Sequence, residues 1–490
     1  MGQTQDLKTK TVSGLFWQFL QKISGQLVSF AVSVVLARLL SPDDFGVVAL
    51  AGMFTVLLGI FSSGGLGPAL VQKKDADNLD YDTMFVTQLF FSVLMYGIIF
   101  FTAPIYANIY DNDQLTIIIR VSALLMPLGA LGGVQASVVS RKMQFRWFFY
   151  TSLVSLFTSA AVGLYMAYSG YGPWALIGQS MTSSVVGTLV LFCLMDWHPR
   201  FRFSYPRFKL LFREGLKFMG TSLMGTFFGQ LRGYALGLKY SASDLAYYNR
   251  GEGIPSLLCD NIDGTIQGVL FPALAKLQDD KQAVRRALSR AIRTSTFILM
   301  PMLFGLAAIA DKVVIIVFSE KWASSIPFMR ILCFVLAVGI MCSVNLQALR
   351  ATGNIGTVFK LEFLKKPIML LMILATIQIS PLAIAWGMLF FNIFVYFVNS
   401  YPNKKNIDYS YKEQIKDVAP NILLALAMAA VVYLVGCFDM NIYISVIVQV
   451  LVGLAFFLPL SYFLKNDSLF YIIDYIKEYR RNKSLKDGNA

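Results

Sequence analysis

Long apolar runs separated by short polar segments occupy most of the chain. A bilayer core about 30 Å thick requires about 20 apolar residues in an α-helix that rises about 1.5 Å per residue. By this measure the sequence predicts about fourteen membrane-spanning helices. The weakest are 254–275, which contains Asp260 and Asp263, and the pair that flanks the very short turn at Ser380-Pro381. The predicted spans are residues 15–37, 46–70, 83–106, 115–138, 147–168, 172–195, 215–238, 254–275, 294–311, 326–349, 357–379, 381–399, 418–436 and 442–464. We therefore expect an all-α integral membrane protein.

The basic residues alternate with these runs and indicate which side of the membrane each loop faces. Lys and Arg concentrate in the cytoplasmic loops of membrane proteins. With the N-terminus inside, 33 of the 42 Lys and Arg residues fall in inner segments and 7 in outer segments or outer helix ends. A missed helix would invert this alternation in the rest of the chain. The sequence therefore predicts that both termini are cytoplasmic.

Composition agrees with this class and excludes others. The chain is 56% hydrophobic and 14% charged, whereas a soluble domain is about 25% charged. In a soluble protein, the net charge of +14 would suggest a nucleic-acid partner. Here the charge comes from the basic residues in the loops between the spans, and we expect no such partner. The five cysteines lie in apolar stretches without a Cys/His cluster, so we predict no disulfide framework, no metal site and no cofactor.

The last segment, residues 465–490, combines apolar residues with Lys and Arg. Basic segments next to a membrane helix can contact anionic lipid headgroups. A solvated tail that stops translocation has the same composition. Both interpretations stay open.

A weak internal repeat relates the two halves of the chain. Ser41 and Asp44 match Ser241 and Asp244 at an offset of 200, and three further matches follow in order at offsets that rise to 212. These are Pro68-Ala69-Leu70 with Pro272-Ala273-Leu274, Arg120 with Arg330, and Gln135-Ala136 with Gln347-Ala348. Each copy contains six spans, so the copies have the same orientation, and parallel repeats place a substrate site at their interface.

The repeat predicts three parts of the chain. Residues 1–213 and 214–410 form two pseudo-symmetric six-helix bundles. Residues 411–490 add helices 13 and 14 and the basic cytoplasmic tail. Internal symmetry of this kind is typical of a transporter rather than an enzyme.

Four segments carry a family resemblance. They are Leu36–Gly46, Gly64–Lys73, Arg141–Phe145 and Tyr247–Gly251. Together they resemble hallmark segments of bacterial polysaccharide exporters, the Wzx-type lipid-linked oligosaccharide flippases of the MATE-like superfamily. The resemblance covers roughly residues 10–400.

The resemblance implies a function. A protein of this kind moves undecaprenyl-pyrophosphate-linked repeat units across the bacterial inner membrane by alternating access, for the synthesis of cell-surface polysaccharide such as lipopolysaccharide. Its partners would be the lipid-linked oligosaccharide, the bilayer and a polysaccharide polymerase. Family members differ in how transport is energised, so H⁺ or Na⁺ coupling stays open.

Basic residues within the predicted spans are the candidates for substrate binding. A charge within a span costs about 2.5–3.5 kcal/mol and usually faces a cavity, and guanidinium groups suit phosphate. We predict that Arg232, beside Gln230, lines such a cavity. Arg120 and Arg330 either lie at its outer mouth or extend to the lipid headgroups. Lys22 lines the cavity or contacts headgroups on the cytoplasmic side.

Two carboxylates in the eighth predicted span are candidates for cation coupling. Asp260 and Asp263 are three residues apart and hence on one helical face. Carboxylates with raised pKa values could bind H⁺ or Na⁺. An ion pair with Arg232 or Arg250 is the alternative.

Glycines cluster near the end of the second predicted span, at Gly64, Gly65 and Gly67, followed by Pro68. Helix breakers are tolerated in membrane helices, and glycine also permits close helix packing. The sequence leaves a hinge and a packing contact open.

Other functions fit the sequence less well. A membrane glycosyltransferase or polymerase would use acidic residues on an outer loop, such as Asp111 and Asp113, but this loop is short and no hydrolase, zinc-protease or nucleotide-binding motif is present. A cation-coupled multidrug exporter of the same superfamily would need an acidic cavity. A membrane scaffold would not explain buried arginines. We therefore expect a transporter without catalytic residues.

Overall fold

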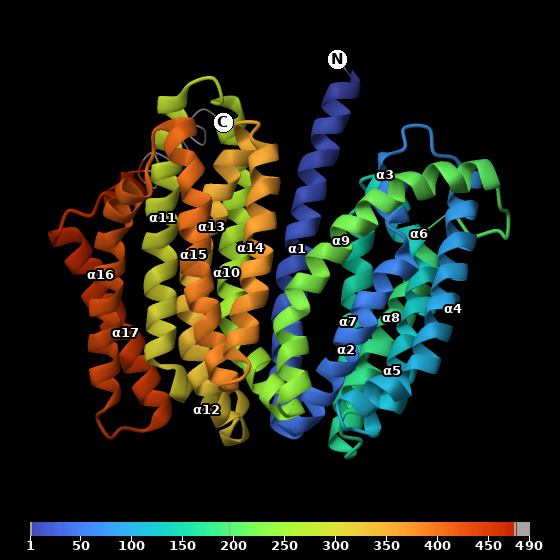
Figure 1. The fold of residues 1–490 in the computed structure, drawn as a ribbon, viewed down its shortest axis with the longest axis horizontal. Helices are drawn as coiled ribbons and strands as arrows, with labels where there is room; N and C mark the ends of the chain where they lie inside the picture. The colour runs from blue at the N-terminus through green and yellow to red at the C-terminus, as the bar shows by residue number, and fades with distance from the viewer. Residues whose placement is uncertain (1, 196, 475–476, 478–490) are drawn as a thin grey trace, which may run out of the picture. The chain divides into compact units, whose positions relative to one another are not determined.

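The computed structural model describes residues 2–195, 197–474 and 477, and within these residues every regular element is helical. The chain divides into two compact units, Met1–Ala246 and Tyr247–Ala490, whose helices are labelled in Figure 1. Within the predicted basic tail, residues 475–476 and 478–490 lie outside the described residues. The domain boundaries expected at 213/214 and 410/411 stay predictions.

The first unit contains nine complete helices among its described residues and the start of a tenth. They are α1 (Gly2–Leu39), α2 (Pro42–Ser63), α3 (Leu66–Gln72), α4 (Asn78–Ile109), α5 (Gln114–Ala123), α6 (Leu125–Arg141), α7 (Arg146–Tyr168), α8 (Trp174–Leu194), α9 (Tyr205–Lys239) and the beginning of α10 (Ala242–Lys276). α7 and α8 form an antiparallel pair with α1 against α7, and α4 packs against α2, α5 and α6. Figure 1 shows that α9 is curved rather than straight, and it packs on α2 and α3.

The second unit contains the rest of α10 and the helices that follow it. They are α11 (Lys281–Ala308), α12 (Ala310–Phe318), the 3-10 helix η1 (Glu320–Ser325), α13 (Ile326–Ala351), α14 (Ile355–Thr376), α15 (Pro381–Ile407), α16 (Tyr411–Gly436) and α17 (Ile442–Phe463). α11 packs against both α13 and α16, and α13 packs against α15. α14 lies along α15, and α17 lies along α16, as Figure 1 shows.

Eleven helical stretches in the described residues are long and apolar enough to cross a membrane, and each corresponds to one predicted span. The other three predicted spans, 215–238, 254–275 and 357–379, lie within α9, α10 and α14. These helices have sufficient length but more polar sequences; α14, for example, contains Lys360, Glu362, Lys365 and Lys366. The class of multi-pass helical membrane protein is confirmed, and the count of fourteen stays a prediction.

Three predicted spans contain a break between two helices, and one of them, 294–311, is broken near its end at Ile309. The span at 46–70 is interrupted at Gly64 and Gly65, which have φ angles of +57° and +65°. The span at 115–138 is interrupted at Leu124, and Pro127 follows in the first turn of α6. Proline fits a first turn because the N–H it lacks would have no partner within the helix there.

Gly65 also allows a close contact between α3 and α9. A Cβ atom at this position would collide with the carbonyl oxygen of Gly215 and lie 2.9 Å from the backbone nitrogen of Met219. Close packing therefore accounts for Gly65, since its neighbours are backbone atoms that cannot move independently. The proposed hinge function of this segment stays a prediction.

The repeat is visible in local structure at the starts of α2 and α10. The Ser41 hydroxyl donates to Asp44 Oδ2 at 2.7 Å, and the Ser241 hydroxyl donates to Asp244 Oδ2 at the same distance. In return, the backbone N–H groups of Asp44 and Asp244 donate to the two serine hydroxyls. This reciprocal capping satisfies N–H groups that have no partner within the helix. The two copies thus begin a helix in the same way.

Candidate transport site

The two predicted outer-mouth arginines have different surroundings. Arg120 on α5 is half-buried, its Nε donates to the Phe100 carbonyl oxygen at 3.0 Å, and its guanidinium lies 4.1 Å from the Phe100 ring centre. Within the described residues, no carboxylate pairs with Arg120. Arg330 on α13 forms an ion pair with Asp311 at 3.5 Å, and both residues are half-buried. Only Arg330 would have to leave an ion pair to bind an anion.

The remaining predicted basic residues lie on α1 and α9. Lys22 is exposed on α1, next to Gln21, whose amide donates to Ser152 of α7 at 2.9 Å. Arg232 and Gln230 are half-buried on α9. Two residues beyond Arg232, the Tyr234 hydroxyl donates to the Met53 carbonyl oxygen of α2 at 2.9 Å. Because residues two apart in a helix point to different faces, Arg232 does not share the face on which Tyr234 contacts α2.

The predicted carboxylates of α10 differ in burial. Asp260 is exposed, whereas Asp263 is half-buried and accepts hydrogen bonds from Gln267 at 2.5 Å and from the Ser343 hydroxyl of α13 at 2.8 Å. Gln347, also on α13, donates to Gln267 Oε1 at 2.7 Å. A chain of polar side chains thus joins α10 to α13 within the second unit. Within this chain, the Asp263 carboxylate is the group that could exchange a proton or bind a cation.

A buried lysine on α14 lies within the predicted span 357–379 but was not among the predicted site residues. Lys365 is 6% exposed and pairs with Glu362 at 2.5 Å. Its Nζ also donates to Asn399 of α15 at 3.3 Å, and Asn399 donates to the Cys342 carbonyl oxygen of α13. The signal that could have revealed it is the Glu362–Lys365 spacing, because residues three apart share a helix face.

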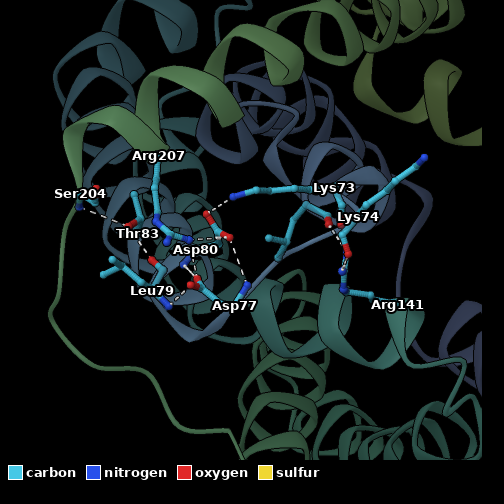
Figure 2. A network of polar contacts seen from close by, with 10 residues as sticks. Lys73, Lys74, Asp77, Leu79, Asp80, Thr83, Arg141, Ser204 and Arg207 are labelled. Carbon is cyan, nitrogen blue, oxygen red and sulfur yellow. Dashed lines mark hydrogen bonds and ion pairs between the residues drawn. The ribbon is translucent and has the colours of Figure 1, made fainter.

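A second missed cluster surrounds Asp80 at the start of α4. The Asp80 side chain is fully buried, and Figure 2 shows it between Lys73 and Arg207. Lys73 Nζ lies 2.5 Å from Asp80 Oδ1, and Arg207 of α9 lies 3.0 Å from Asp80 Oδ2. The same Arg207 nitrogen lies 2.6 Å from Asp77 Oδ1. We call these four residues the latch, because they join the α3–α4 loop to the beginning of α9.

Asp77 is the N-cap of α4 and completes the latch. Its carboxylate accepts from the backbone N–H groups of Leu79 and Asp80 at 3.1 and 3.0 Å. The Asp80 N–H hydrogen bond, with the positive charge of Arg207, lowers the pKa of Asp77 below its usual value. Asp77 therefore stays ionised and continues to pair with Arg207 under mildly acidic conditions.

Arg141, at the end of α6, fixes the same loop from another side. Its guanidinium donates to the carbonyl oxygens of Leu70 at 3.2 Å, Lys73, and Lys74 at 2.5 Å, as Figure 2 shows for the two lysines. Lys73 and Arg141 come from two of the segments that carry the family resemblance. The structure brings these two segments together, which sequence spacing alone does not indicate.

The segment Tyr247–Gly251 has a packing role in the second unit. The Arg250 guanidinium lies 4.8 Å from the Phe318 ring centre and 4.9 Å from that of Trp322. A Cβ atom at Gly251 would lie 2.9 Å from the backbone nitrogen of Met329. The glycine is therefore required where α10 meets α13.

A largely apolar cavity of about 350 Å³ lies among α2, α4, α5 and α6 of the first unit. Hydroxyl side chains and Gln88 line one part of it. Gln88 is 5% exposed, and within the described residues its Oε1 atom has no hydrogen-bond partner. Sequence reasoning did not identify this cavity, because its residues come from four separated segments.

The arrangement of helices is that of a known class of membrane transporter. The chain is similar to a solved structure of the lipid II flippase MurJ in an inward closed conformation, with a TM-score of 0.73 and 16% identity over 92% of this chain and 99% of that one. It is also similar to an inward-facing multidrug resistance MATE family transporter, with a TM-score of 0.59 and 15% identity over 78% of this chain and 94% of that one. The protein thus has a MATE-like fold.

Sequence comparison identifies the family to which the chain belongs. A family model described as "Polysaccharide biosynthesis protein" matches residues 35–327, and the chain belongs to this family. The succinoglycan biosynthesis transport protein ExoT of Rhizobium meliloti is 27% identical over 73% of this chain and 72% of its own length. The lipopolysaccharide biosynthesis protein WzxC of Escherichia coli is 23% identical over 73% of each chain. The predicted family resemblance is confirmed.

Proposed function

We propose that the protein translocates polyprenyl-pyrophosphate-linked oligosaccharide repeat units across the bacterial inner membrane by alternating access, for cell-surface polysaccharide synthesis. One observation carries the proposal: a chain of the polysaccharide biosynthesis family has a fold similar to that of a lipid II flippase over 92% of its length. ExoT, similar over much of its sequence, is named as a transport protein in succinoglycan biosynthesis. Both comparisons favour transport over catalysis.

Arginines are assigned to the anionic part of the substrate in this proposal. Arg232 and Gln230 of α9 contact the pyrophosphate, because a guanidinium presents paired N–H donors to phosphate oxygens. Arg120 and Arg330 contact the substrate nearer the outer side, and Arg330 first leaves Asp311. Lys22, exposed on α1, attracts the substrate from the cytoplasmic side. In this topology both termini are cytoplasmic, and a polysaccharide polymerase receives the exported unit.

Two sources of energy fit the proposal. Each negative charge that moves outward gains about 2.3 kcal/mol per 100 mV of inside-negative potential. Alternatively, Asp263 and Asp260 couple export to H⁺ or Na⁺, which the half-buried position of Asp263 supports. Transport into vesicles with the potential collapsed and a proton or sodium gradient retained separates these sources. Export that follows the potential alone and is unchanged by Asp263→Asn would reject ion coupling.

A multidrug exporter has a similar fold, so the fold alone does not tell whether the cargo is a drug or a lipid-linked oligosaccharide. The family match does, because its description and the names of ExoT and WzxC refer to polysaccharide biosynthesis. The charged residues nominated for substrate contact are also mainly basic, which suits an anionic cargo rather than a cation.

Deletion of the gene tests the proposed function in cells. We expect lipid-linked oligosaccharide to accumulate on the inner leaflet while its synthesis continues, and a plasmid copy to restore export. Normal surface polysaccharide in the deletion strain, with no accumulation and no second exporter expressed, would contradict the proposal.

A further inference from the structure

A basic cavity of about 610 Å³ lies in the second unit, away from the residues assigned above to transport. Its walls come from the first turns of α11, the beginning of α16 and residues 467–471 after α17. The cavity therefore depends on the last two membrane helices of the chain.

Ion pairs shape the walls of this cavity. Arg293 of α11 lies 2.5 Å from Asp417 of α16 and 2.7 Å from Asp467. Arg285, two turns earlier, lies 2.8 Å from Glu413. Each of the three acidic side chains that line the cavity is thus already paired with an arginine.

Two hydroxyl groups also donate hydrogen bonds to the Asp417 carboxylate. The Ser289 hydroxyl and the Tyr409 hydroxyl each donate to Asp417 Oδ2 at 2.6 Å. With Arg293 on Oδ1, both carboxylate oxygens have internal partners. A carboxylate engaged in this way offers little repulsion to an incoming anion and instead keeps Arg293 in place.

Three further basic side chains line the cavity and are not paired with an acidic side chain within the described residues. Arg286, Arg290 and Lys416 are exposed, and none of them forms an ion pair within the described part of the chain. The Arg290 guanidinium lies 4.7 Å from the ring centre of Tyr471, which fixes its direction. The cavity therefore carries five cationic and three anionic side chains and favours an anion.

An apolar groove continues from this cavity. A second cavity of about 490 Å³ shares Arg293 and Lys416 with the first and extends along α16 and α17. Its further walls include Leu423, Leu424 and Leu460. A free anion would fill only the basic cavity. A lipid fits both cavities, because its charged headgroup suits the basic cavity and its apolar chain suits the groove.

We propose that this paired cavity, formed by α11, α16 and α17, binds an anionic membrane phospholipid. Arg286, Arg290 and Lys416 contact the phosphate of the headgroup, since guanidinium and ammonium groups donate charge-assisted hydrogen bonds to phosphate oxygens. An acyl chain lies along the leucines of α16 and α17. The bound lipid holds residues 467–471 against α11 and α16.

Lipid binding to the purified full-length protein tests the proposal. Phosphatidylglycerol is titrated into detergent-solubilised protein, and the bound lipid is counted by native mass spectrometry. The cavity variant carries Arg286→Gln, Arg290→Gln and Lys416→Gln. The control variant loses the same charge at exposed lysines outside the cavity, through Lys281→Gln, Lys404→Gln and Lys412→Gln.

We expect the wild type and the control to bind phosphatidylglycerol equally and the cavity variant to bind it about 100-fold more weakly, from the usual contribution of each basic side chain to anionic-lipid binding. Thermal unfolding in the absence of phosphatidylglycerol should be the same for all three proteins, which excludes misfolding. Equal binding by the cavity variant would overturn the proposal. Displacement of the lipid by inorganic phosphate at similar concentration would show a phosphate site that needs no lipid, and would overturn it as well.

Discussion

Arg232 is the residue on which the proposed substrate contact depends most. It is half-buried on α9, and a charge within a membrane span usually faces a cavity. We expect Arg232→Ala to lower export about 10- to 100-fold, because the loss of hydrogen bonds to a charged group costs about 1.5–3 kcal/mol. Export of the glycan by strains with equal amounts of inserted protein measures this. Arg213→Ala, an exposed arginine on the same helix, is the control; an equal effect of both would remove Arg232 from the mechanism.

The latch gives a prediction about stability. Asp80→Asn removes the charge that pairs with Lys73 and Arg207, so both cations lose their buried partner. We expect a loss of about 2–3 kcal/mol in the free energy of unfolding. Asp75→Asn, at an exposed position in the same loop, should have little effect. Thermal unfolding in detergent compares them, and equal melting temperatures would show that the latch contributes nothing to stability.

At the level of single residues, the sequence predicted some site residues and missed others. Arg232 and Asp263 stood out because a charge within an apolar run is conspicuous. Asp80, which is fully buried, escaped notice because it lies in a polar segment between two spans. Its partner Arg207 is distant in sequence, and no local pattern could connect the two.

At the scale of helices, Gly46 tests how closely α2 approaches the start of α10. A Cβ atom at Gly46 would collide with the backbone of Ala242, including its carbonyl oxygen. We expect Gly46→Ala to destabilise the protein by about 1–3 kcal/mol, since the helix backbones would have to separate. Gly52, on the same helix, has no atom within 4 Å of the corresponding position, so Gly52→Ala should be neutral or mildly stabilising. Thermal unfolding of the two variants measures the difference, and a stable Gly46→Ala variant would refute the contact.

Helix positions were largely predictable from apolar length, whereas breaks within helices were not. Each of the fourteen predicted runs falls on a helix, or on two helices with a break between them. The break at Gly64 and Gly65 needs left-handed backbone at two successive residues, and the contact with Gly215 selects glycine there. Such a contact joins segments that are distant in sequence, so hydrophobic pattern alone does not reveal it.

At the scale of the whole molecule, we propose that the protein by itself moves an anionic, lipid-linked glycan across a bilayer. The repeat supports this view, because its two copies begin α2 and α10 with the same hydrogen-bonded cap. The fold similarity to MurJ and the family match are the two observations from which the proposal was drawn.

Transport by the purified protein in liposomes is the most direct test. Lipid-linked oligosaccharide isolated from the deletion strain is reconstituted with the protein, and its exposure on the outer leaflet is followed by cleavage with an external glycosidase. The account predicts that wild-type protein makes the initially protected fraction cleavable with time, and that Arg232→Ala slows this at least tenfold. A protected fraction that stays constant in intact, protein-containing liposomes, under both a membrane potential and an ion gradient, would contradict it.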